Sequence, residues 1–90
     1  AEKQKAYDVY VTEIDNALKT VKYEDADIAD VKVENIKKAV KADLDKVTAP
    51  AGASYEIKEA KATGEVTVKV KSTESVVTLA ADVVETVTAK

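Results

Sequence analysis

Apolar side chains recur at intervals of three and four residues over the first part of the chain, as they do along one face of an α-helix. Charged residues such as Glu2, Lys5 and Asp8 fall on the other side. This pattern predicts an amphipathic helix over residues 3–20. Its apolar stripe consists of Ala6, Tyr10, Ile14, Ala17, Leu18 and Val21.

A second stripe of the same period begins after a break. Between residues 21 and 32 the helical spacing fails, and we expect an extended link that alternates briefly at Val21 and Tyr23. Pro50 disfavours helical angles at Ala49 and so limits how far the next helix can extend. A helix is therefore predicted over residues 33–47. Its stripe consists of Val33, Ile36, Val40, Leu44 and Val47.

The last third of the chain changes to an apolar alternation of period two, which is typical of strands. Strands are predicted over residues 54–59, 65–71 and 76–89. Gly64 can supply a positive φ in the turn before the second of them. Glu85 interrupts the inward series of the last strand, so we expect a bulge or bend near residues 80–85.

This order of elements predicts a single α+β domain over residues 1–90. Two amphipathic helices would pack on one face of a three- or four-stranded antiparallel sheet. A chain of 90 residues suffices for one such domain and is too short for two. The inward face of the middle strand would carry Val66, Val68 and Val70, and its outward face Thr67, Lys69 and Lys71.

The composition removes most of the groups that catalysis uses, because the chain has no Cys, His, Met, Trp, Phe or Arg. Without His there is no base near pH 7 to place beside Ser54, Ser72 or Ser75. A serine–lysine pair would need Lys58 or Lys69 to be desolvated, and both are expected to be exposed. We therefore predict no enzyme activity, no catalytic residue and no cofactor.

Carboxylate pairs are a further candidate for acid–base chemistry. The carboxylates of Asp43 and Asp45, or of Glu56 and Glu59, could in principle act as an acid and a base. Their positions are those of ordinary solvated faces, and a chain without Trp or Phe has little material for a sugar cleft. We expect these carboxylates to be solvated.

Aromatic and amide side chains offer two more possibilities. The tyrosines could form a stacking platform for a sugar or peptide, but core packing is the favoured interpretation because no other aromatic residue is present. A Lys–Asn isopeptide bond would need a dry pocket, and both asparagines are predicted on or beside helices. The residues concerned are Tyr7, Tyr10, Tyr23, Tyr55, Asn16 and Asn35.

The acidic stretch over residues 24–30 is the strongest candidate for chemistry. Calcium takes about six to eight oxygen ligands, and Asp25, Asp27 and Asp30 supply carboxylates. The EF-hand spacing is not met, because the sixth position from Asp25 is Asp30 rather than Gly and the twelfth is Ile36 rather than Glu. A solvated link that favours the start of the second helix is the preferred interpretation, with calcium binding as the alternative.

Charge and hydropathy limit the partners. The net charge is −3 and the lysines are scattered among carboxylates, which argues against nucleic acid. No apolar run approaches the roughly 20 residues that span a bilayer, so membrane insertion is not expected. Because the chain starts at Ala1 rather than at Met, we expect a piece of a longer protein whose targeting signal lies elsewhere.

Five stretches share the order and residue pattern of a known kind of module. They are Asn16-Ala17-Leu18, Val21-Lys22-Tyr23, residues 36–44, the strand opener over residues 64–70 and the closing residues 85–89. On these stretches the chain resembles the tandem-repeat modules of Gram-positive cell-surface and S-layer-associated proteins. The resemblance implies a non-catalytic structural spacer at the cell surface, with neighbouring modules of the same parent protein as partners.

Two other interpretations stay open. The chain could be a small binding domain that docks a host protein or a glycan on its exposed sheet face or an edge strand. It could also be an artificial or redesigned sequence, because it uses only fourteen residue types and mixes its surface charges. Near-copies within a longer precursor would favour the spacer, and saturable binding would favour the binding domain.

Overall fold

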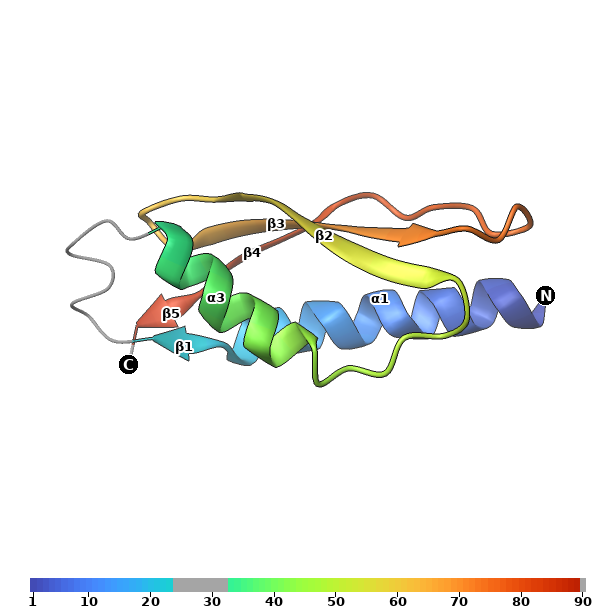
Figure 1. The fold of residues 1–90 in the computed structure, drawn as a ribbon, viewed down its shortest axis with the longest axis horizontal. Helices are drawn as coiled ribbons and strands as arrows, with labels where there is room; N and C mark the ends of the chain where they lie inside the picture. The colour runs from blue at the N-terminus through green and yellow to red at the C-terminus, as the bar shows by residue number, and fades with distance from the viewer. Residues whose placement is uncertain (24–32, 90) are drawn as a thin grey trace.

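The computed structural model describes residues 1–23 and 33–89, in which two helices pack against one face of an antiparallel sheet (Figure 1). The sheet has three strands in the order β2–β3–β4. The predicted α+β class is confirmed. The elements are α1 (Glu2–Thr20), β1 (Lys22–Tyr23), α3 (Val33–Leu44), β2 (Ala53–Ala60), β3 (Glu65–Ser72), β4 (Val83–Thr86) and β5 (Thr88–Ala89).

The first helix buries the face that its period predicts, with one difference at its start. Tyr10, Ile14 and Leu18 are buried, but Ala6 is exposed and Tyr7 takes its place at 1% exposure. Both positions lie about one turn before Tyr10, so either could face the core. The larger apolar ring of tyrosine buries more surface than a methyl group, and this decides the rotation of the first turn.

The second helix buries Ile36, Val40 and Leu44 as predicted but is three residues shorter than the predicted range of 33–47. The N–H groups of Lys46 and Val47 donate to carbonyl oxygens only three residues back, at 3.2 and 3.0 Å. Bonds of this spacing belong to a tighter turn than the α-helix. The helix therefore ends at Leu44, before Pro50 can limit it.

The middle strand, β3, buries one face in the core. Val66, Val68 and Val70 are at most 2% exposed, which confirms the predicted inward face. β2 and β3 are antiparallel, and their register shifts between Ile57 and Glu59. On the outward face Lys71 is exposed, whereas Thr67 and Lys69 are half-buried.

The predicted strand over residues 76–89 is wrong over its first half. Residues 73–82 form no regular strand; β4 starts at Val83, and the chain breaks again at Val87 before β5. The predicted bulge or bend near residues 80–85 is not found: β4 pairs with β3 without a register shift, and the interruption falls at Val87, whose N–H donates to the carbonyl oxygen of Gly64 at 2.8 Å. β5 then pairs with β1 in parallel, which the purely antiparallel prediction did not include.

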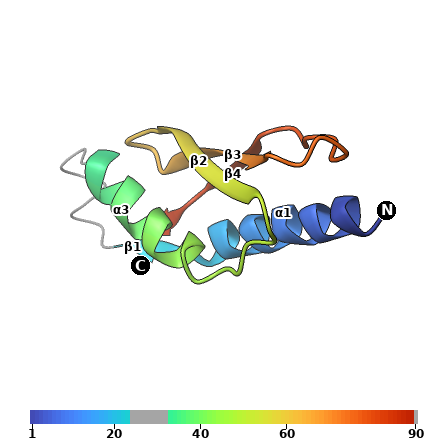
Figure 2. The same cartoon turned by 45° about the vertical axis from the view of Figure 1, so that its right-hand side comes forward.

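The molecule is elongated, with extents of 45 × 18 × 15 Å. Figures 1 and 2 place the N-terminus at one end of the long axis and β5, with the C-terminus, at the other. The axis of α1 follows the long direction, and its 19 residues account for about 28 Å at ~1.5 Å per residue. The start of α1 and the end of β5 thus lie at opposite ends of the molecule.

Candidate functional site

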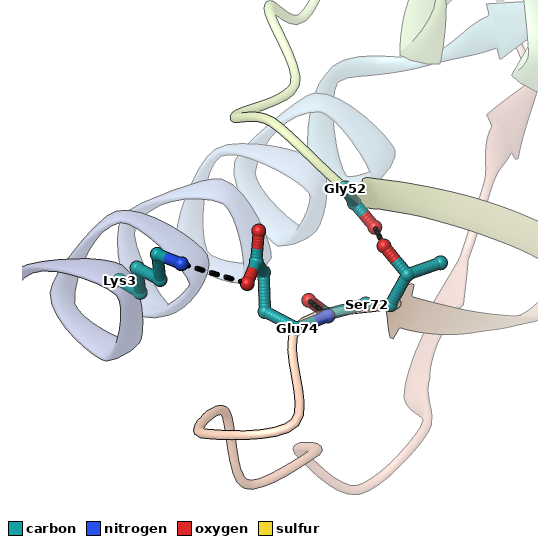
Figure 3. A network of polar contacts seen from close by, with 5 residues as sticks. Lys3, Gly52, Ser72 and Glu74 are labelled. Atoms are coloured by element: carbon teal, nitrogen blue, oxygen red, sulfur yellow. Dashed lines mark hydrogen bonds and ion pairs between the residues drawn. The ribbon is translucent and has the colours of Figure 1, made fainter.

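A group of polar contacts closes the N-terminal end of the molecule (Figure 3). The Lys3 ammonium lies 2.8 Å from the Glu74 carboxylate, and the backbone N–H of Glu74 donates to Oγ of Ser72 at 3.1 Å. Thr73 donates through its N–H and its hydroxyl to the carbonyl oxygen of Gly52, at 2.9 and 3.4 Å. These five residues, here called the N-terminal clasp, tie α1 to the segment after β3 and to the start of β2.

Three of the four tyrosines belong to the core. Tyr7, Tyr10 and Tyr23 are at most 5% exposed, which confirms core packing as their role. The Tyr7 hydroxyl donates to the Val70 carbonyl oxygen at 2.8 Å and accepts from the N–H of Ala80 at 2.9 Å. The fourth, Tyr55, is half-buried at the edge of a surface hollow.

That hollow, of about 490 Å³, lies between α1, the end of α3 and the start of β2. The Tyr55 hydroxyl donates to Asp45 at 2.7 Å. Burial and then this hydrogen bond raise the pKa of Tyr55, while the same bond and then Lys41 lower the pKa of Asp45. Both shifts move the pKa values further from pH 7. The phenol therefore stays protonated and the carboxylate stays ionised near pH 7.

The carboxylates of the two predicted pairs are each held by a lysine rather than by one another. Asp43 lies 3.5 Å from Lys46, and Asp45 lies 3.0 Å from Lys41. On the sheet, the Glu56 carboxylate lies 3.0 Å from the Lys71 ammonium, which lowers the pKa of Glu56. Lysine partners favour the ionised form, which is the opposite of what a general acid needs.

Of the serine and lysine candidates, Lys58 and Ser72 are engaged in other contacts. Lys58 pairs with Asp82 at 3.1 Å, and Ser72 accepts the N–H of Glu74 in the N-terminal clasp. Ser54 and Ser75 are exposed. Lys69 is half-buried, which corrects the expectation that it is exposed.

Two carboxyl groups come together in a pairing that no pattern in the sequence indicated. Asp15 on α1 and Glu85 on β4 bring their carboxyl groups within hydrogen-bonding reach, and Lys19 lies 3.1 Å from Asp15. The bond to Asp15 and then burial raise the pKa of Glu85, whereas the bond to Glu85 and then Lys19 lower the pKa of Asp15. The two shifts favour a protonated Glu85 that donates to an ionised Asp15 when only one of the two carboxyl groups is ionised.

The predicted calcium candidates Asp25, Asp27 and Asp30 lie outside the described residues, so calcium binding stays a prediction. Within residues 1–23 and 33–89 no three acidic side chains gather as a metal site would require. Asn16 and Asn35 are exposed, so neither lies in the dry pocket that an isopeptide bond needs.

No family model, no characterised protein and no solved structure matches this chain. The resemblance to surface-protein modules therefore stays a prediction made from the sequence. Neither of the helices that the structure describes is long and apolar enough to cross a membrane.

Proposed function

We propose that this chain is a non-catalytic spacer module of a bacterial surface or exported protein, joined end to end with neighbouring modules. The observation that carries the proposal is the position of the termini at opposite ends of the 45 Å axis (Figure 1). A chain of such modules gains length with every copy, whereas a domain whose termini lie together adds a side branch.

The polar chemistry supports a structural role. In the described part of the chain every buried side-chain nitrogen or oxygen has a hydrogen-bond partner. Several charged groups that the sequence offered for catalysis are engaged in ion pairs on the surface, as for Lys58 with Asp82 and Glu56 with Lys71. Such pairs contribute little stability individually, but they leave those side chains paired rather than poised for proton transfer.

Small-angle X-ray scattering of one copy and of two copies joined in tandem tests the proposal. If the modules continue end to end, the maximum dimension of the tandem chain should roughly double relative to one copy, whose long axis is 45 Å. A tandem chain only slightly longer than one copy would contradict the spacer role, because the two modules would then fold back side by side.

The matched control joins the same two copies through a long glycine–serine linker. Such a linker behaves as a flexible coil, so this chain should show a broad distribution of distances. A direct tandem as broad as this control would also argue against a spacer, since the junction would then set no direction.

A further inference from the structure

We propose that the module is built to bear tension along its long axis, because force applied at its two ends loads the terminal segments in shear. This inference rests on the proposed spacer function. It concerns what happens when the chain of modules is pulled, whereas scattering tests only how the modules are arranged at rest.

The two terminal segments run side by side in the same direction. β1, which continues α1, pairs in parallel with β5, with Lys22 opposite Thr88 and Tyr23 opposite Ala89. α1 also packs against β4. Figure 1 shows the N-terminus of α1 at one end of this arrangement and the tip of β5 at the other. Tension therefore draws α1 toward one end and the β4–β5 segment toward the other, so that they must slide along each other.

The hydrogen bonds between β4 and β3 lie across the direction of the force. β4 is antiparallel to β3 from Val68 opposite Val83 to Glu65 opposite Thr86. Hydrogen bonds between antiparallel strands are perpendicular to the strands. Force along β4 consequently loads all of its bonds to β3 together, whereas force that separates the strands from one end breaks them one pair at a time.

Other contacts fasten the sliding surface along its length. At the N-terminal end Lys3 pairs with Glu74 at 2.8 Å. Further along, the Gln4 side-chain amide exchanges two hydrogen bonds with the backbone of Thr78, at 2.7 and 3.2 Å. Tyr7 then accepts the N–H of Ala80 at 2.9 Å. Sliding of the C-terminal segment past α1 breaks these contacts at the same time as the β3–β4 bonds.

The direction of pulling can be tested on one protein with two attachments. In the first arrangement force acts between the N- and C-termini. In the second it acts between the C-terminus and a cysteine at Thr63→Cys, an exposed residue of the turn before β3. Residue 63 lies beside the Glu65–Thr86 end of the ladder, so this arrangement peels β4 from that end. The natural chain has no cysteine, so the attachment is unique.

Single-molecule force spectroscopy at one pulling speed should then give an unfolding force roughly two-fold or more higher for the terminal attachment than for the Thr63 attachment, because forced unfolding follows the barrier along the pulling direction. Complete unfolding from the termini should release about 280 Å, which is the extended length of 90 residues at ~3.6 Å each less the 45 Å folded length.

Equal forces in the two directions, or a lower force for the terminal attachment, would overturn the load-bearing role. Urea denaturation of the Thr63→Cys protein should match that of the natural chain, which excludes a simple loss of stability as the cause of a lower force. An extended tandem chain in scattering combined with equal pulling forces would leave the spacer function in place and reject only its adaptation to tension.

Discussion

The hydroxyl of Tyr7 donates a hydrogen bond of 2.8 Å to the carbonyl oxygen of Val70, and this bond joins the first helix to the middle strand inside the core. The hydroxyl oxygen of Tyr7 also accepts a hydrogen bond from the N–H of Ala80, at 2.9 Å. One side chain on α1 thus satisfies backbone groups from two segments that lie more than sixty residues away in sequence. It also keeps the segment before β4 beside the helix.

Replacing Tyr7 with phenylalanine should destabilise the protein by about 1–3 kcal/mol, because the ring still fills its place while the partners of the hydroxyl lose a buried hydrogen bond. Urea denaturation followed by circular dichroism measures the free energy of unfolding. Tyr10→Phe is the matched control on the same helix. Tyr10 lines the surface hollow of about 490 Å³, and its hydroxyl makes no hydrogen bond to another described residue. Equal losses in the two variants would show that the Tyr7 bonds contribute nothing specific.

Gly64 should tolerate substitution far less well than Gly52, although both have a positive φ, of 87° and 80°. A Cβ at Gly64 would meet the backbone oxygen of Val87 and the Tyr23 hydroxyl oxygen, both at 2.6 Å. At Gly52 the closest atom, at 2.7 Å, is the hydroxyl oxygen of the Thr73 side chain, which can rotate away. The positive φ alone costs about 1–2 kcal/mol for alanine.

Gly52→Ala should therefore lower the free energy of unfolding by about 1–2 kcal/mol. Gly64→Ala should lower it more, because the new Cβ would meet the backbone of Val87, whose N–H is hydrogen-bonded to the carbonyl oxygen of Gly64. Thermal denaturation of the two variants gives the comparison. A larger loss at Gly52 would mean that the junction between β4 and β5 is looser than the 2.8 Å bond from Val87 to Gly64 indicates.

The parts of the fold that the sequence predicts well are those in which burial follows a strict period. Ile36, Val40 and Leu44 on one helix, and Val66 and Val68 on the middle strand, are all fully buried as their spacing predicts. A period identifies the face that turns inward because every member of the series gains free energy of burial on that same face. Chain ends and junctions carry no such repetition, and the errors at the first turn of α1 and at the end of α3 lie there.

The segment over residues 76–82 shows why alternation alone is not sufficient for a strand. Val77 and Leu79 alternate with Thr78 and Ala80, yet none of the strands that the structure describes pairs with this segment. Side chains of α1 take the backbone groups that a strand would have paired, since Gln4 bonds to Thr78 and Tyr7 to Ala80. This pairing depends on tertiary structure, and local sequence does not encode it.

Gln4→Ala should therefore release this segment. The N–H of Thr78 donates to Oε1 of Gln4 at 2.7 Å, and its carbonyl oxygen accepts from Nε2 at 3.2 Å. Loss of both exposed bonds should cost about 0.5–1.5 kcal/mol and speed amide exchange at Thr78. Gln4→Glu is the informative comparison, because it keeps an acceptor for the N–H and removes only the donor. Unchanged exchange at Thr78 in Gln4→Ala would show that the amide does not hold the segment.

Of the pair formed by Asp15 and Glu85, the sequence pattern indicated only one member. Glu85 stood out because it interrupts the inward series, and in the sheet it lies opposite the buried Val66. Nothing in the local pattern placed Asp15 opposite it, because that residue falls at the edge of the apolar stripe of a distant helix. Pairs of this kind form where two periodic faces meet, and the angle at which they meet is a property of the packed fold.

The stability of this pair should depend on pH in two opposite ways. The raised pKa of Glu85 contributes stability that is present at low pH and is lost as the pH rises through its folded value, above the ordinary 4.5. The lowered pKa of Asp15 contributes stability that is present above the ordinary 3.8 and is lost as the pH falls through its folded value. Between these two pKa values a protonated Glu85 donates to an ionised Asp15, and the pair is most favourable.

Glu85→Gln should consequently be more stable than the natural chain at pH 7–8, because the amide donates to Asp15 at every pH and removes a like charge. This advantage should shrink toward pH 4, where the natural carboxyl is itself protonated. Asp15→Asn removes the same repulsion but also breaks the 3.1 Å pair with Lys19, so its gain at neutral pH should be smaller. Urea denaturation of the three proteins from pH 4 to 8 measures the differences. If the advantage of Glu85→Gln did not change with pH, a protonated Glu85 would not be donating to Asp15.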